Sequence, residues 1–301
     1  GGQQMELRVL RYFLMVAREE NITRAAEHLH ITQPTLSRQL QQLEEELGCK
    51  LFDRSSHNIM LTEDGMRLKK HAQDIVTLAD RTEREFAKQQ EIAGEIVFGC
   101  GEARCMDDLA GYMERFQKMY PQVQYELYTA NADDVKERLD KGLVDIGLLS
   151  EPVDISKYNF IRLKQKERWG ILVAEDMPLA EKEAVTSEDL LSVPLFMTKR
   201  TIVKSELESW FGDLFEQIQI AGTYNLLNNA AAMVRHHMGA ALCYQIGVTY
   251  AHLKFIPLVP RLETGFVLVW RKNQVVSNSV ESFIQMTKDE ICRESISDTK
   301  Q

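Results

Sequence analysis

Polar side chains that could read DNA bases lie on one face of a helix predicted near the N-terminus. They are Gln33, Thr35, Ser37, Arg38, Gln41 and Gln42. Arginine can bind guanine through two hydrogen bonds and glutamine can bind adenine in the same way, while hydroxyls and helix N-terminal amides can donate to phosphates. An ordinary solvated helix face would carry similar residues, so the neighbouring elements must decide between the two interpretations.

Three helices are predicted around these side chains. The first runs from Leu7 to about Glu20, and the second is a short helix that Thr23 can cap and that ends near His30. The third is capped by Thr32, carries Pro34 in its first turn and ends at Gly48, with a buried stripe predicted at Leu36, Leu40, Leu43 and Leu47. A short helix, a brief turn and a longer polar-faced helix indicate a helix-turn-helix.

Two short strands follow the third helix. They are predicted at Leu51 and Phe52 and at 59–62, and a polar turn of residues 54–58 joins them. Such a hairpin is typical of a wing that reaches a neighbouring groove or phosphate. It favours DNA binding over a merely solvated helix face.

A long helix is predicted from Asp64 to about Ile92. Its apolar side chains alternate in steps of four and three, and they are Leu68, Ala72, Ile75, Ala79, Thr82 and Phe86. The stripe is narrow and the other faces are densely charged, which favours a dimer-forming linker over a helix packed only on its own domain.

Strands and helices alternate after Gly94, which predicts parallel α/β structure in two lobes with a ligand cleft between them. The first of these strands leads into Gly101, Glu102, Ala103 and Arg104, just before a predicted helix N-terminus. Free amides there could bind a carboxylate, with Arg104 as its partner. Arg104 also stands where a dinucleotide-binding loop needs its third glycine, so we exclude that loop.

The N-terminal third closely resembles the DNA-binding domain of LysR-type transcriptional regulators, a bacterial family. The matching runs are 13–17, 23–30, 33–40, 43–48, 51–54 and 61–65. The resemblance implies that Gln33, Pro34, Thr35, Ser37 and Arg38 lie at or near the DNA. It also implies that Arg54, on the wing, contacts the DNA backbone or minor groove.

The runs 115–121 and 139–148 resemble the effector domain of the same family, which has a periplasmic-binding-protein-like fold. The resemblance implies that Asn131, Leu149 to Glu151 and Thr198 to Thr201 line the cleft. The expected fold is therefore α/β with an all-α, winged N-terminal domain. We expect a winged helix-turn-helix at 5–63, a dimerising linker helix at 64–92 and an effector-binding domain at 93–295, with lobe I at about 93–166 and 266–295 and lobe II at about 167–265.

Composition limits the partners. The formal net charge of -9 and the pI of about 5.4 mean that contact with double-stranded DNA must be local. Five cysteines without metal-ligand spacing predict neither a metal nor a cofactor, and no nucleophile, base or metal motif indicates an enzyme. No run is long and apolar enough for a membrane span, so we expect a cytoplasmic protein.

The expected partners are a pseudo-palindromic operator, a small-molecule effector of carboxylate type and a second copy of the chain. The assembly expected is a homodimer or, as the resemblance implies, a homotetramer, and RNA polymerase is a further candidate partner. Two alternatives stay open. One is a redox-responsive regulator that uses Cys100 and Cys105, which lie near a helix N-terminus. The other is a regulator without a ligand.

Overall fold

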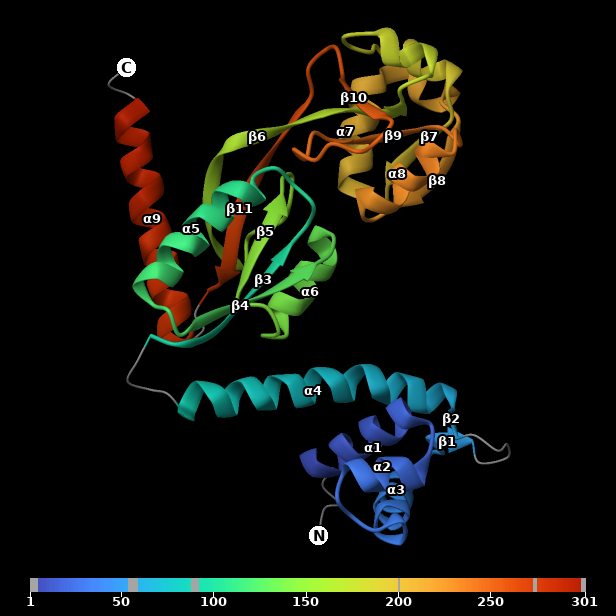
Figure 1. The fold of residues 1–301 in the computed structure, drawn as a ribbon, viewed down its shortest axis with the longest axis vertical. Coiled ribbons are helices and arrows are strands. Elements are labelled where there is room, and N and C mark those ends of the chain that lie inside the picture. Colours follow the sequence, from blue (N-terminus) through green and yellow to red (C-terminus); the bar gives the residue numbers. More distant parts are fainter. Residues whose placement is uncertain (1–4, 54–58, 88–91, 200, 273–274, 299–301) are drawn as a thin grey trace. The chain divides into compact units, whose positions relative to one another are not determined.

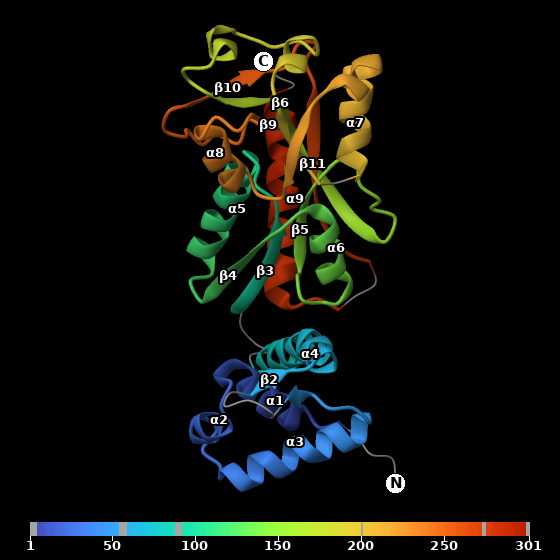
Figure 2. The ribbon, with the colours of Figure 1, turned by 90° about the vertical axis from the view of Figure 1, so that its right-hand side faces the viewer.

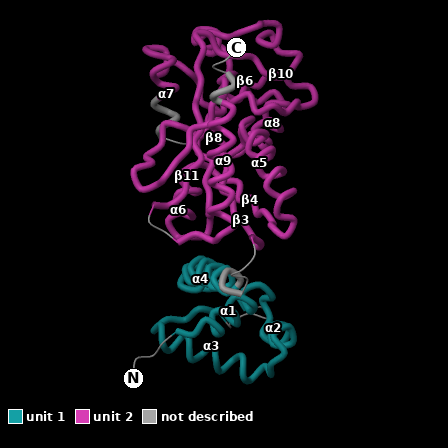
Figure 3. Tube along the Cα trace, turned by 90° about the vertical axis from the view of Figure 1, so that its left-hand side faces the viewer, with its two compact units in different colours: residues 1–89 teal, residues 90–301 magenta. Residues whose placement is uncertain are grey.

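The computed structural model describes residues 5–53, 59–87, 92–199, 201–272 and 275–298. Only the backbone is described for residues 84–87, 201–205 and 295–298. The chain divides into two compact units, residues 1–89 and 90–301 (Figure 3). None of the described helices is long and apolar enough to cross a membrane.

The first unit is helical with one small hairpin. Its elements are α1 (Leu7–Glu19), α2 (Ile22–His28), α3 (Gln33–Leu47), β1 (Phe52–Asp53), β2 (Met60–Leu61) and α4 (Glu63–Ala87). They share one apolar core, which includes Phe13, Ala25, Leu36, Leu40 and Ala72. The predicted helix-turn-helix and wing strands are confirmed. The cap of α2 was predicted wrongly, because the side chain of Asn21, rather than Thr23, accepts the Arg24 amide.

The second unit begins with lobe I, a sheet covered by helices on both faces (Figure 1). Its elements are β3 (Gly94–Cys100), α5 (Met106–Met119), β4 (Val123–Thr129), α6 (Ala132–Asp140), β5 (Ile146–Ser150) and the C-terminal α9 (Asn278–Asp298). Phe98, Phe116 and Phe283 pack edge to face between the sheet, α5 and α9. On the other face Val135 and Leu139 of α6 join a second apolar cluster.

Lobe II follows and is built on the same plan. Its strands and helices are β7 (Leu195–Thr198), α7 (Thr201–Phe211), β8 (Ile220–Tyr224), α8 (Leu227–Arg235), β9 (Ala240–Tyr244) and β10 (Leu253–Pro257). Apolar clusters around Trp169 and Leu195 on one face, and around Leu172 and Ala230 on the other, form its core.

Two long strands connect the lobes, β6 (Tyr158–Ala174) and β11 (Glu263–Arg271). They pair antiparallel with each other, and β6 continues antiparallel to β9 and β10 in lobe II (Figure 2). The strand order is β4-β3-β5-β11-β6-β9-β7-β8. The sheet is therefore mixed, which corrects the parallel arrangement expected from strand and helix alternation. Apart from Phe160, the exposed side chains in the first half of β6 are polar, and this masked the strand from a search for apolar runs.

Candidate functional site

Helix α3 is fixed at both ends by local signals. The Thr32 hydroxyl accepts the Thr35 amide at 3.4 Å, Pro34 occupies the first turn, and Gly48 ends the helix with a φ of 69°. Only glycine adopts that left-handed conformation without strain. These caps set the position of the helix in the fold, and so they set which side chains face outward.

The outward face of α3 carries six residues predicted to lie at the DNA. Gln33, Pro34, Thr35, Arg38 and Gln41 are exposed. Ser37, the remaining predicted contact on this helix, is half-buried and accepts a hydrogen bond from Gln33 Nε2 at 3.0 Å. The structure therefore brings all six together on one accessible surface.

The inward face of α3 differs from the prediction at two positions. Leu47 is 42% exposed and does not continue the stripe of Leu36, Leu40 and Leu43. The stripe instead includes Glu44, whose Oε1 accepts the amides of Leu51 at 2.8 Å and Phe52 at 3.3 Å. A carboxylate can take a core position here because it satisfies buried backbone donors.

Glu44 also accepts a hydrogen bond from Lys50 Nζ at 2.9 Å. Burial raises the pKa of Glu44, but the bonds from Lys50 and from the two amides outweigh it, so the net shift of the pKa is downward. The carboxylate thus ties α3 to the first wing strand. Arg54, predicted to contact DNA from the wing, lies outside the described residues.

The residues of the dimer seam predicted on α4 fall into two groups, one packed on the first unit's own core and one exposed. Ala72 is fully buried in the core of its own unit and Leu68 packs against the same core, because this face of α4 lies on α1. The prediction that Leu68 and Ala72 belong to the dimer seam is therefore wrong, because they hold α4 to its own domain. Ile75 is 41% exposed, and Thr82 is exposed while Ala79 is half-buried. The side chain of Phe86 lies outside the described residues.

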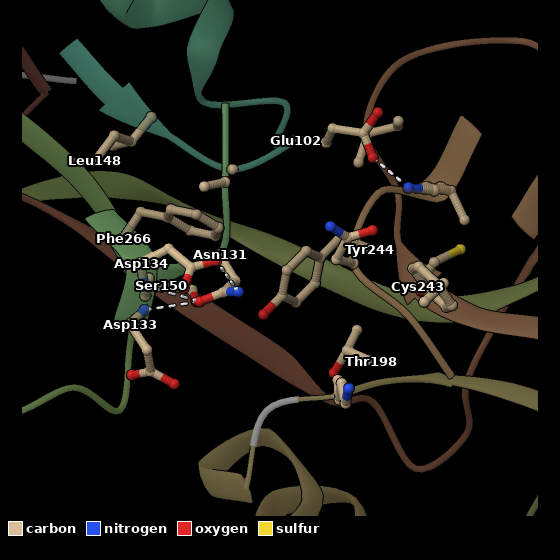
Figure 4. Close-up of a pocket in the computed structure, with 18 of the residues that line it drawn as sticks. Glu102, Asn131, Asp133, Asp134, Leu148, Ser150, Thr198, Cys243, Tyr244 and Phe266 are labelled. Carbon is tan, nitrogen blue, oxygen red and sulfur yellow. Dashed lines mark hydrogen bonds between the residues drawn. The ribbon is translucent and has the colours of Figure 1, made fainter. Parts of the chain in front are cut away.

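A cleft of about 380 Å³ opens between the two lobes of the second unit. Lobe I contributes the loop after β3 and the start of α6, and lobe II contributes the end of β7 and the start of α8. The volume falls within the range of small-molecule sites, roughly 300 to 1,000 Å³. Its lining joins apolar and charged groups, many of them drawn in Figure 4.

Six predicted residues line the cleft: Gly101, Glu102, Asn131, Ser150, Thr198 and Lys199. Asn131 also caps α6, since its side chain accepts the amides of Asp133 and Asp134. Thr201 begins α7, and its side chain lies outside the described part of the chain.

Four predicted lining residues lie elsewhere, and these predictions are corrected. One of them, Glu151, instead forms an ion pair with Arg162 at 3.0 Å. Leu149 is fully buried in the cluster under α6, because alternate residues of a strand face opposite sides and the cleft receives its neighbours Leu148 and Ser150. Ala103 is buried in the cluster under α5. Arg104 is exposed and is not among the lining residues.

Most of the cleft's aromatic and acidic lining was not predicted from the sequence. Trp169, Tyr244 and Phe266 come from the crossing strands and β9, and their rings meet edge to face, with Tyr244 4.4 Å from Trp169 and 5.8 Å from Phe266 between centroids. Figure 4 shows Asn131, Asp133 and Asp134 together, with Tyr244 between them and Glu102. The two aspartates lie in the first turn of α6, after the helix cap Asn131 and Ala132, and that position could have indicated them from the sequence.

Glu102 connects the lobes across the cleft. Its Oε2 accepts a short hydrogen bond from the backbone amide of Leu227, the first residue of α8 (Figure 4). The positive end of the α8 dipole favours a carboxylate at this point. The N-terminus of α8 could have bound a carboxylate of the ligand. Glu102 already occupies that position, so the chain itself supplies the carboxylate.

A second carboxylate, Glu167, lies buried where the strands cross. Its Oε1 accepts the Cys105 amide, at the start of α5, at 2.7 Å. Burial raises the pKa of Glu167 and, together with the Glu167 charge, raises the pKa of the Cys105 thiol. Burial also raises the pKa of Cys100. Buried thiols that resist ionisation are poor redox sensors, which argues against the redox alternative.

The two units define a class of protein: a winged helix-turn-helix that presents a polar recognition helix, and a two-lobed domain that encloses a ligand-sized cleft. Two family models match the chain. The bacterial regulatory helix-turn-helix protein, lysR family, matches residues 7–66, and the LysR substrate binding domain matches residues 89–291. The chain therefore belongs to the LysR family of transcriptional regulators, which bind DNA and carry an effector-binding domain.

Individual relatives agree with this assignment. The chain is 30% identical over 209 residues to the HTH-type transcriptional regulator IlvY of Escherichia coli, covering 69% of this chain and 70% of that protein. It is 29% identical over 292 residues to the HTH-type transcriptional regulator AlsR of Bacillus subtilis, covering 95% and 91%. Full-length CbnR in complex with its target DNA shares the fold, with a TM-score of 0.74 at 21% identity over 95% of this chain and 99% of that one.

Proposed function

We propose that this regulator binds a pseudo-palindromic operator as a homodimer or homotetramer, and that a small molecule in the cleft changes the arrangement of its DNA-binding domains. The observation that carries the proposal is the capped helix α3, which presents Gln33, Thr35, Arg38 and Gln41 together on an exposed face. In this proposal residues 5–63 bind DNA, 64–92 link protomers and 93–295 bind the effector. No catalytic role is included.

DNA contact must be concentrated on α3, because the chain as a whole is acidic. Arg38→Ala should weaken specific operator binding by roughly 1 to 3 kcal/mol if Arg38 reads a guanine. Arg8→Ala is the matched control, since Arg8 is an exposed arginine of α1 that pairs with Glu6. Operators selected from random duplexes would be titrated at fixed salt. Equal losses for both variants would contradict a base-reading role for Arg38.

The oligomer proposal rests on the face of α4 that does not pack on α1. Ile75 and Leu78 are each 41% exposed, and Thr82 lies one turn further along the same side. These three residues define the α4 stripe. Two copies of the stripe could bury each other and so present two recognition helices to one operator, which multiplies weak local contacts.

Ile75→Glu should dissociate the assembly, because it places a charge within the apolar part of the α4 stripe. Met66→Glu is the control, since Met66 is 58% exposed on the opposite side of the same helix. Sedimentation equilibrium of both variants measures the result. An unchanged mass for Ile75→Glu would place the interface between protomers somewhere other than α4.

The remaining parts of the proposal concern partners and location. We propose that the regulator acts in the cytoplasm, where it meets the operator, and that RNA polymerase is the partner through which bound protein changes transcription. A carboxylate remains one element of the proposed effector, since Thr198 and Lys199 offer a hydroxyl and an ammonium to it from lobe II. The charges on lobe I suggest a second element.

A further inference from the structure

The charges that line the cleft are divided between the lobes. Lobe I contributes the carboxylates of Glu102, Asp133 and Asp134, whereas Lys199 is the ammonium contributed by lobe II among the described lining residues. The N-termini of α6 and α8 each add roughly half a positive charge. The lobe I side still keeps an excess of negative charge, so a purely anionic ligand would be repelled there.

Glu102 is the carboxylate best placed to contact a ligand directly. Its Oε2 is held by the Leu227 amide, and within the described part of the chain Oε1 has no hydrogen-bond partner. Asp134 already accepts a hydrogen bond from Asn131 Nδ2 at 2.7 Å. A carboxylate fixed at one oxygen and open at the other is preorganised to bind a cationic donor.

The opposite lobe offers an unused hydroxyl. Thr198 Oγ1 is buried in the cleft lining and has no hydrogen-bond partner among the described residues. A buried polar atom without a partner is costly, so a ligand that bonds to it recovers that free energy. Lys199 follows directly in the sequence and also lines the cleft. Together the two side chains are suited to a carboxylate.

Between these charged groups the lining is aromatic, with Trp169, Tyr244 and Phe266 in edge contact. Trp169 is fully buried: its indole nitrogen donates a hydrogen bond to Thr264 Oγ1 at 2.8 Å, and its ring packs against Tyr244. A ligand body that lies on this aromatic lining should therefore be apolar.

We propose that the effector is a zwitterion, an amino acid with an apolar side chain, whose ammonium contacts Glu102 and whose carboxylate contacts Thr198 and Lys199. This inference rests on the proposed role of the cleft as the effector site. One molecule of this kind bridges both lobes and so couples binding to their relative position.

The test compares two sets of matched probes on the full chain by thermal shift and calorimetry. One set is phenylalanine, 3-phenylpropionate and 2-phenethylamine, and the other is leucine, 4-methylpentanoate and 3-methylbutylamine. Each amino acid keeps both charges, and each analogue keeps one. We expect at least one amino acid to bind about tenfold or more tightly than both of its analogues. Each analogue lacks either the ammonium or the carboxylate, so it loses one of the two charge-assisted contacts.

Glu102→Gln separates a ligand contact from a structural role, because glutamine keeps a carbonyl for the Leu227 amide but loses the charge. The variant should lose the preference for the amino acid over the carboxylate analogue while binding that analogue at least as well as before. Glu126→Gln, at an exposed position of β4 outside the cleft lining, should change neither affinity.

Two results would overturn the inference: an analogue that binds as tightly as its amino acid in both sets, or no binding by any of the six probes. Operator binding by the same preparations, measured without probes, keeps the two proposals distinguishable. If it is intact while the probes fail, the ligand class is wrong and the regulator proposal stands. If the wild-type chain selects no operator, the proposed function itself fails.

Discussion

Glu44→Ala should loosen the contact between α3 and the wing. The carboxylate is the acceptor for the buried amides of Leu51 and Phe52 and the partner of Lys50. Alanine removes the acceptor and leaves both amides in the core. The Lys50 side chain is largely exposed and its ammonium can return to water, so the two amides dominate the cost.

A buried donor that loses its acceptor costs about 1–3 kcal/mol. The Leu51 bond at 2.8 Å is near ideal and the Phe52 bond at 3.3 Å is longer and weaker, so we expect a total loss of about 2–4 kcal/mol. Since about 1.4 kcal/mol corresponds to a factor of ten, the opened population of the first unit should rise roughly 30- to 700-fold.

Amide hydrogen exchange of the full chain, followed by mass spectrometry, measures this change in peptides that cover α3 and β1. Peptides from α5 in the second unit serve as an internal reference. Glu45→Ala is the control, because Glu45 is exposed and accepts a bond from exposed Gln41, and its loss should cost less than about 0.5 kcal/mol. Equal exchange in the two variants would refute the assignment of Glu44 as the tie between α3 and the wing.

Three further outcomes are expected. The folded-state pKa of Glu44 is lowered, so its charge stabilises the fold above pH 4.5, and this stabilisation is lost as the pH falls through the folded pKa. The difference in unfolding free energy between wild type and Glu44→Gln should therefore shrink in acid. A difference that grows in acid would contradict the lowered pKa. Gly65→Ala should destabilise the first unit by about 1–3 kcal/mol in denaturant titrations, because a Cβ would lie 2.1 Å from the Leu51 carbonyl oxygen. An unchanged midpoint would show that the backbone moves to relieve this clash. Iodoacetamide should label exposed Cys292 well before buried Cys105, and comparable rates would restore the redox alternative.

Local signals in the sequence were sufficient for α3. Thr32, Pro34 and Gly48 determine where the helix starts and stops, and a period of 3.6 residues then assigns its outward face. Both effects act within a few residues, so they do not depend on the rest of the chain. The wing strands and the strands and helices from β3 to β5 in lobe I were predictable for the same reason.

The cleft lining required more than local signals. Strand β5 contributes Leu148 and Ser150 rather than Leu149, and a shift of one residue in the strand would exchange these faces. The buried position of Glu44 was equally hidden, because charge patterning does not show which backbone amides a carboxylate will meet.

The sequence by itself determined the class of protein, its recognition helix and the presence of two α/β lobes. The tertiary structure decided which residues face the cleft, which side of α4 is left uncovered, and that Glu102 of lobe I binds the start of α8 in lobe II. These features depend on pairing between segments far apart in the chain. Glu102 and Leu227, for example, are separated by 125 residues, and only the crossing strands β6 and β11 bring them together.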